Sequence, residues 1–365
     1  MDFTHTETRQ MLADTLGRWV LNDYPLADRL AAGQSETGFA PEKFAALAEL
    51  GALGAVLPES AGGFGGEGFD IVVLFEALGR GLVVEPVLQS AVLGGAILAA
   101  CGKEDLVTEI ISGTEIVTLA HDEGGMPGEE ITTDAARFGD GWVLNGAKSV
   151  IRAAEAATHL IVTARTDAGT GLFLVRSDAA GLSLHGYPTI DGGRAAEVKL
   201  DNLSLHNAAC LTTDGAATLE EAMGRGLLAL VAEALGLMET IKDLTIEYVR
   251  TRKQFGVPIG KFQALQHRIA EMMLEIEQAR SAVIRAASVL EQPGIERERA
   301  LSAAKVTIGR VGTLIGEETI QIHGGMGMTW EYPVGHFVKR LTMIGHEMGD
   351  EDFHLMRYIQ LGKTA

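Results

Sequence analysis

The fold of this chain is decided by the stretch Arg252-Lys253-Gln254-Phe255-Gly256-Val257-Pro258-Ile259-Gly260, which links two long amphipathic patterns. A second glycine motif follows downstream as Gln321-Ile322-His323-Gly324-Gly325-Met326-Gly327. A planar guanidinium beside glycines, whose backbone can approach a ligand closely, suits the pyrophosphate of a dinucleotide. Each stretch taken alone also fits a plain helix–helix turn with a surface arginine, so both interpretations stand at this point.

Composition is typical of a globular protein. The chain has 365 residues, of which 47% are hydrophobic and 22% charged, enough for two or three domains with sizeable cores. Its two cysteines, Cys101 and Cys210, have no metal-like spacing, so neither a metal site nor a disulfide framework is predicted. The start of the chain lacks the basic and apolar regions of a signal peptide, and the longest apolar run, residues 226–238, is too short to span a bilayer. We therefore expect no membrane interaction and a cytoplasmic location.

The net charge narrows the range of partners. At −19, the field of the chain repels nucleic acid and anionic lipid surfaces. Nucleic acid is therefore not an expected partner. The same field opposes small anions, so an anionic cofactor would have to be held by local arginines and backbone amides.

The hydrophobic pattern changes its period twice along the chain. Residues 1 to about 115 show helical spacing from residue 3 onward, with Pro41 opening a second helix and a glycine-rich loop at 57–66. Short β-rich runs separated by glycine and aspartate turns follow; they lie at 142–144, 160–162, 171–175 and 196–200. From about 215 the helical period returns in three long apolar faces, and a final helix is expected near 353–359.

These periods predict an α+β protein that is mainly α. The predicted parts are an N-terminal helical domain at 1–115, a middle antiparallel β-domain at 116–213, and a C-terminal four-helix bundle at 214–365. Long helices joined by short links pack antiparallel, which favours a bundle for the last part.

The order helical, β, helical, taken together with the motifs, resembles the acyl-CoA dehydrogenase family. The motifs are the two stretches above, Phe262-Gln263-Ala264-Leu265-Gln266-His267, and Glu331-Tyr332-Pro333. Leu47-Ala48-Glu49-Leu50-Gly51 and Pro58-Glu59 followed by Gly62-Gly63 also resemble that family, so the resemblance covers essentially the whole chain.

The resemblance implies a flavoenzyme that removes two hydrogens from the α and β carbons of an acyl-CoA thioester. A carboxylate takes the α proton, FAD accepts the β hydride, and the electrons pass to an electron-transfer flavoprotein. The redox chemistry belongs to FAD, while the protein supplies orientation, a clamp on the thioester carbonyl and the base. In this family FAD lies at a subunit interface, where the arginine link and the glycine loop of one subunit reach the flavin of its neighbour.

Carried over residue by residue, the resemblance implies cofactor-binding positions at both motifs. Arg252 would hold the pyrophosphate, with Gln254 and Phe255 lining the same stretch. Gln263 or Gln266 would reach toward the adenosine end. The loop that contacts the neighbour's adenylate would consist of Gln321, Gly324 and Gly325.

The positions that would hold the flavin ring depart from the family pattern. In place of a Thr-Glu-Pro stretch ending in Gly-Ser, the chain has Leu119-Ala120-His121-Asp122-Glu123-Gly124-Gly125. In place of an Ile-Thr-Asn turn it has Ile151-Arg152-Ala153. His121, Arg152 and Arg225 are open to two interpretations, as substrate contacts or as surface groups, and a structural role is preferred for the two arginines.

A catalytic base is absent from both positions where the family keeps it. The helical position falls on Gly226, beside Arg225, and the C-terminal position falls on Met348, next to Glu347. A shift of one residue would make Glu347 the base, but one residue rotates a helical side chain by about 100°, so Glu347 also fits an ordinary surface acid.

Within the family, the closest resemblance is to the small subunit of pimeloyl-CoA dehydrogenase and to paired-subunit acyl-CoA dehydrogenases of bacterial steroid side-chain breakdown. Residues 250–260 and 335–344 carry this resemblance. Three hypotheses follow. The first is one half of a heteromeric enzyme that donates Arg252 and the Gly324-Gly325 loop to a second acyl-CoA dehydrogenase-like subunit. The others are an active homo-oligomer with Glu347 or a rearranged acid as base, and a non-catalytic acyl-CoA-binding or scaffold protein on the same fold.

Overall fold

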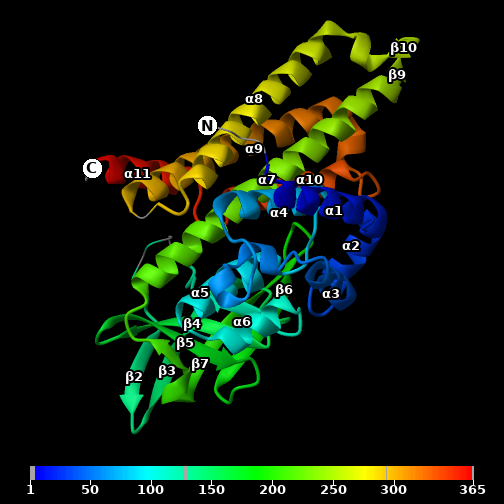
Figure 1. Cartoon of the computed structure of the whole chain (residues 1–365). Helices are drawn as coiled ribbons and strands as arrows, with labels where there is room; N and C mark the ends of the chain where they lie inside the picture. Colours follow the sequence, from blue (N-terminus) through cyan, green and yellow to red (C-terminus); the bar gives the residue numbers. More distant parts are fainter. Residues whose placement is uncertain (1–4, 126–127, 129, 293, 364–365) are drawn as a thin grey trace. The chain divides into compact units, whose positions relative to one another are not determined.

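The computed structural model of the protein describes residues 5–125, 128, 130–292 and 294–363 (Figure 1). The chain forms two compact units. Unit 1 comprises residues 1–26, 67–83 and 227–365, and unit 2 comprises residues 27–66 and 84–226. None of the described helices is both long enough and apolar enough to cross a membrane. The units cut the chain differently from the predicted boundaries after 115 and 213, which stay predictions.

The helices of unit 2 are short. They are α2 (Leu26–Gln34), α3 (Pro41–Glu49), the turns η1 (Gly54–Val56) and η2 (Glu59–Ala61), the π-helical η3 (Leu88–Gly94), α5 (Gly95–Ala100) and α6 (Glu104–Ile111). Pro41 opens α3, as the sequence predicts, because its missing N–H is not needed in the first helical turn. Glycines keep the 57–66 segment out of an α-helix, and Gly62 ends η2 with φ of 86°.

Eight strands of unit 2 form one sheet. They are β1 (Val117–Ala120), β2 (Asp134–Phe138), β3 (Gly141–Arg152), β4 (His159–Thr166), β5 (Gly169–Arg176), β6 (Leu182–Pro188), β7 (Arg194–His206) and β8 (Cys210–Thr212). Their order is β6-β7-β3-β2-β4-β5-β8, with β1 added on β4.

The prediction of a wholly antiparallel sheet was wrong at one strand. β4 pairs in parallel with β1, in the register Val117↔His159, and again in parallel with β2 at Asp134↔Arg165. The other pairings in this sheet are antiparallel. The sheet is therefore mixed, because β1 follows the helix α6 and returns alongside β4 rather than across a hairpin.

Alternate side chains of these strands form the core of unit 2. Trp142 on β3 packs edge-on against Phe173 on β5, with ring centroids 5.3 Å apart and ring planes at 71°. Leu144, Val162 and Val198, from three different strands, are buried in the same cluster. This is the period-2 burial that the β-rich runs predict.

Unit 1 is helical. Its helices are α1 (Glu7–Asp23), α4 (Gly68–Arg80), the greater part of α7 (Ala216–Thr251), α8 (Gln263–Ser288), α9 (Ile295–His323), α10 (Val334–His346) and α11 (Glu351–Lys363). α9 packs against α8, α10 and α11. The predicted final helix is present as α11, and α10 is one described helix more than the four that the sequence predicts after the sheet. The predicted start of the first helix at residue 3 lies outside the described residues.

Glycines allow α4 and α7 to approach at backbone distance. A Cβ added at Gly79 would lie 2.1 Å from the Glu233 carbonyl oxygen, and one added at Gly236 would lie 2.1 Å from the Glu76 carbonyl oxygen. Any larger side chain at either position would push the helices apart. This close crossing brings charged side chains of the two helices together.

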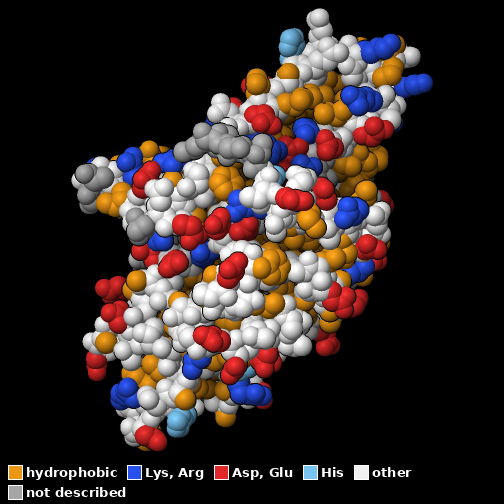
Figure 2. Space-filling view, viewed as in Figure 1, with side chains coloured by type: hydrophobic (Ala, Val, Ile, Leu, Met, Phe, Trp, Pro, Cys, Tyr) orange, Lys and Arg blue, Asp and Glu red, His pale blue; other side chains and the backbone are white. Residues whose placement is uncertain are grey.

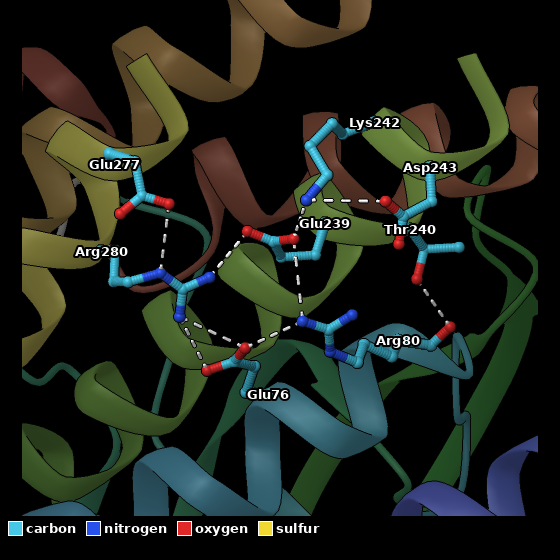
Figure 3. A network of polar contacts seen from close by, with 8 residues as sticks. All are labelled: Glu76, Arg80, Glu239, Thr240, Lys242, Asp243, Glu277 and Arg280. Atoms are coloured by element: carbon cyan, nitrogen blue, oxygen red, sulfur yellow. Dashed lines mark hydrogen bonds and ion pairs between the residues drawn. The ribbon is translucent and has the colours of Figure 1, made fainter. Parts of the chain in front are cut away.

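A network of charges fixes α7 against α4 and α8 (Figure 3). The guanidinium of Arg280 on α8 donates to Glu239 at 2.6 Å and to Glu76 at 3.3 Å. Lys242 also donates to Glu239, whose side chain is only 6% exposed. Burial alone would raise the pKa of Glu239, but Lys242 and Arg280 outweigh it and lower that pKa. Glu239 is thus held ionised between two cations.

We predict that Arg280→Met lowers the free energy of unfolding by about 2–4 kcal/mol, because it leaves buried carboxylates short of a partner. The matched control is Arg310→Met, which removes a mostly exposed arginine paired with Glu275 at 2.9 Å and should cost at most about 1 kcal/mol. Urea unfolding of both variants measures the difference. Equal losses in the two variants would contradict the importance assigned to the network.

Candidate functional site

The decisive stretch of sequence forms a hairpin between α7 and α8. Its two short strands are β9 (Lys253–Gln254) and β10 (Val257–Pro258), which pair antiparallel. Phe255 and Gly256 form the turn, with φ of 52° and 80°, the left-handed values of a two-residue type I′ turn. Phe255 is 90% exposed, and its ring lies edge-to-face with the ring of Phe262, with centroids 6.1 Å apart. The hairpin therefore presents an aromatic side chain outward.

Arg252 has a fixed backbone and an uncommitted side chain. Its N–H donates to the Tyr248 carbonyl at 2.8 Å, and its carbonyl accepts from Ile259 N–H at 2.8 Å. Within the described residues its exposed guanidinium makes no ion pair or hydrogen bond. Arg252 is therefore available to a ligand at this end of unit 1.

The second glycine motif caps α9. Gly324 directly follows α9 with φ of 59° and begins the 3-10 turn η6 (Gly324–Met328). A Cβ added at Gly324 or Gly325 would meet nothing within 4 Å, so open space lies beside both. Tyr248 donates its hydroxyl hydrogen to the carbonyl of His323 at 3.2 Å. Because Arg252 follows Tyr248 by one helical turn, the structure brings the two motifs to the same end of unit 1.

The four predicted glutamines lie on these same elements. Gln254 is exposed on β9, Gln263 is the first residue of α8, and Gln321 is exposed in the last turn of α9. Gln266 differs, because its side-chain amide donates to the Gly260 carbonyl at 2.8 Å and braces the link into α8. The donor set at this end, a guanidinium beside open backbone at two glycines, fits the pyrophosphate and adenylate end of FAD.

The predicted flavin-ring positions are filled by ion pairs within unit 2. Lys148 is fully buried and donates to Glu123 at 2.6 Å, to Thr163 at 3.0 Å and to the His121 carbonyl at 3.2 Å. Burial would raise the pKa of Glu123, but hydrogen bonds from Lys148 and the 132–133 segment lower it. Burial also lowers the pKa of His121, whose ring lies 3.1 Å from the Thr163 hydroxyl. These side chains are committed to one another.

Arg152 is likewise paired within unit 2. Its guanidinium donates to Asp191 at 2.9 Å, and the Asp191 carbonyl accepts a hydrogen bond from Arg29 at 2.6 Å. The neighbouring Ala153 adopts φ of 58°. The set of side chains at 119–125 and 151–153 therefore does not fit the hydrogen-bonding needs of a flavin ring, in contrast to the end near Arg252.

Arg225 lies at the edge of a cavity. Its guanidinium donates to the Gly66 carbonyl, which ties α7 to the end of the 57–66 segment. The cavity has a volume of about 390 Å³ and is lined by residues of the 56–61 segment, α5 and the first turns of α7. This contact gives Arg225 a structural partner inside unit 2.

The candidate base Glu347 is tied to an arginine. Arg340 on α10 donates to Glu347 at 2.6 Å. The same guanidinium makes two further bonds to Glu233, at 2.6 and 2.8 Å. A carboxylate held this way must break an ion pair before it can take a proton. The alternative positions, Gly226 and Met348, carry no acid.

The backbone beside Glu347 is fixed by two buried side chains that sequence reasoning missed. Lys305 of α9 donates to the carbonyls of Gly345 and Gly349. His354 of α11 lies with Nε2 2.9 Å from the Met348 carbonyl and Nδ1 3.2 Å from the Ser302 hydroxyl. A lysine directly beside an apolar helical stripe was the only sequence signal for this turn.

The pKa of His354 predicts a loss of stability in acid. Burial lowers the pKa of His354 to about 4 from 6.5, although its bond to Met348 opposes the shift. The unfolded chain therefore binds this proton between pH 6.5 and 4 while the folded chain does not, so stability falls as the pH falls through that window. The free energy of unfolding of the natural chain should fall between pH 6.5 and 4, and we expect His354→Gln to make that fall smaller by about 3 kcal/mol.

Urea unfolding at several pH values between 6.5 and 4 measures this difference. The matched control is His267→Gln, at an exposed histidine of α8, which should leave the pH dependence of the natural chain unchanged. Parallel curves for the natural chain and His354→Gln would show that His354 is protonated in the fold.

Comparison with known proteins agrees with the fold and the motifs. Family models match along the chain: acyl-CoA dehydrogenase N-terminal domain at residues 6–113, middle domain at 117–203 and C-terminal domain at 213–359. The chain is 30% identical over 348 residues to the mitochondrial short-chain specific acyl-CoA dehydrogenase of Homo sapiens. The aligned region covers 90% of this chain and 83% of that protein.

Two solved structures share the whole fold. A chain of the ChsE4-ChsE5 complex from Mycobacterium tuberculosis has a TM-score of 0.92 at 27% identity and covers 100% of both chains. A chain of a Tcur3481-Tcur3483 steroid ACAD variant has a TM-score of 0.88 at 29% identity and covers 98% of this chain and 99% of that one. This protein therefore belongs to the acyl-CoA dehydrogenase family, whose members are oxidoreductases acting on a CH–CH bond.

Proposed function

We propose that this chain is one subunit of a two-subunit, FAD-dependent acyl-CoA dehydrogenase. It lends Arg252 and the Gly324–Gly325 loop to FAD whose flavin ring is held by a second, unlike subunit of the same family. The second subunit also supplies the catalytic carboxylate. Electrons leave the complex through an electron-transfer flavoprotein, as the family resemblance implies.

The observation that carries the proposal is a contrast between two sets of side chains. The group aimed outward, Arg252, has no partner among the described residues. The groups at the ring and base positions, Glu123, Arg152 and Glu347, are all paired inside the chain. Such a chain has the groups that would bind a neighbouring subunit's FAD and lacks the groups that would bind a flavin ring and act as base in its own site.

The exposed apolar surface supports a partner at this end. Figure 2 shows apolar side chains exposed around the hairpin end of α8, beside Lys and Arg side chains. The large hydrophobic residues that are exposed on α8, the hairpin and the loop after α9 are Phe255, Phe262, Met273, Leu274, Met326, Met328 and Trp330. Exposed apolar surface of this kind is typical of a subunit interface.

The two structural relatives described above support a pairing of unlike chains. One is described as the ChsE4-ChsE5 complex, and the other, a steroid ACAD variant, also carries two joined names, Tcur3481-Tcur3483. By analogy we propose an acyl-CoA thioester with a bulky, ring-bearing acyl group as the substrate class. The homo-oligomeric alternative needs Glu347 or a rearranged acid as base, and the ion pair of Glu347 with Arg340 counts against the first of these.

In the proposed complex each part of this chain has a binding role. When bound, FAD supplies the acceptor for the hydride from the β carbon of the acyl group. Arg252 would pair with the pyrophosphate through its planar fork, and the open backbone at Gly324 and Gly325 would allow the adenylate to approach closely. The local guanidinium is needed because the net charge of −19 repels an anion.

We predict that Arg252→Ala weakens FAD binding by the complex about 10- to 100-fold, the loss of a charge-assisted hydrogen bond. For this test, the chain is tagged and purified from its own cells together with the partner that it binds there. Mass spectrometry then identifies the partner as a second acyl-CoA dehydrogenase chain. The matched control is Lys253→Ala, the exposed cation one residue along, which should change the Kd by no more than about twofold. Flavin fluorescence titration of the FAD-stripped complex gives both values.

Three results would contradict the proposal. Equal weakening by Arg252→Ala and Lys253→Ala would mean that only the local field matters. Turnover of acyl-CoA with an artificial electron acceptor by this chain purified alone would show a complete active site. A complex that contains no flavin would favour the non-catalytic scaffold.

A further inference from the structure

Three aromatic rings pack together at the end of unit 1 that carries both motifs, and two of them are stacked. Tyr248 of α7 lies over His323, the last residue of α9, with centroids 4.4 Å apart and ring planes at 29°. Tyr332, just before α10, lies 5.2 Å from His323 and 6.1 Å from Tyr248. The group therefore joins three separate segments of unit 1 directly beneath Gly324.

One hydrogen bond fixes the tautomer of the buried His323 ring. Nδ1 lies 2.9 Å from the Thr319 carbonyl, so Nδ1 carries the proton and Nε2 is a bare acceptor. His323 is 2% exposed, and among the described residues its Nε2 has no hydrogen-bond partner. Burial lowers the pKa of His323, which keeps the ring neutral against Tyr248. The ring is thus held by one backbone bond and by stacking.

Tyr248 contacts both motifs: its side chain contacts the glycine motif after α9, and its backbone contacts the motif that begins at Arg252. Its hydroxyl donates to the His323 carbonyl at 3.2 Å, one of the last four carbonyls of α9, which have no partner within the helix. Its own carbonyl accepts from Arg252 N–H at 2.8 Å. A movement of Tyr248 would therefore change the position of the Gly324–Gly325 loop relative to Arg252.

We propose that Tyr248 is a positioning residue for FAD, and this inference rests on the proposed function above. Its hydroxyl holds the end of α9 so that the backbone at Gly324 and Gly325 faces the same ligand as the Arg252 guanidinium. The aromatic ring keeps the helices packed, while the hydroxyl sets the loop. The two roles separate in a Tyr248→Phe variant, which keeps the ring and loses only the hydroxyl.

Tyr248→Phe is expected to weaken FAD binding by the complex about 3- to 10-fold, the range expected for one neutral hydrogen bond. The Tm of the FAD-free complex should stay within about 2 °C of the natural value, because the ring stack remains. The matched control is Tyr332→Phe in the same group of rings; in the described part of the chain no hydrogen bond involves the Tyr332 hydroxyl. That control should bind FAD as the natural complex does.

The outcomes separate this inference from the proposed function. If Arg252→Ala weakens FAD binding while Tyr248→Phe and Tyr332→Phe both bind FAD normally, the inference fails and the proposed function stands. A Tyr248→Phe complex whose Tm falls along with its FAD affinity shows a purely structural role and also overturns the inference. If Arg252→Ala leaves FAD binding unchanged, the proposed function itself fails.

Discussion

The carboxylate of Glu239, held between Lys242 and Arg280, is the interaction on which the functional end of this chain depends. It lies where glycines let α4 and α7 touch at backbone distance, so the direction of α7 is fixed at this crossing. About two and a half turns further along, the same helix carries Tyr248, and Arg252 directly follows the end of the helix at Thr251. A helix that could rotate or slide at Glu239 would not present that arginine beside the α9 cap.

The charged side chains of the chain fall into two groups with different consequences. Lys148, Arg152 and Arg340 each meet a carboxylate inside their own unit, and Lys305 meets backbone carbonyls. Buried charges of this kind are stable only when paired, so these groups stabilise the fold and are poor candidates for catalysis. Arg252 stands apart as an exposed cation in a chain of net charge −19. The account of function rests on that difference.

Much of this arrangement was readable from the sequence because it depends on local pattern. The helical period predicted α7, α8 and α9, and the motif at Arg252 predicted a ligand site between the first two. The partners of β4 were not readable, because an alternating strand shows which face is buried and not which strand lies beside it. Lys305 and Glu347 were missed or left open for a related reason. Their partners are 40 and 7 residues away, on elements whose packing the period does not specify.

In the proposed complex, this chain completes a flavin site that belongs to another chain. The number of FAD molecules per chain in the complex, from native mass spectrometry combined with flavin absorbance, tests it most directly. We predict one FAD for each pair of this chain with its partner, and no stoichiometric FAD on this chain purified alone. One FAD on every chain of the complex, or a full complement on this chain by itself, would contradict the account.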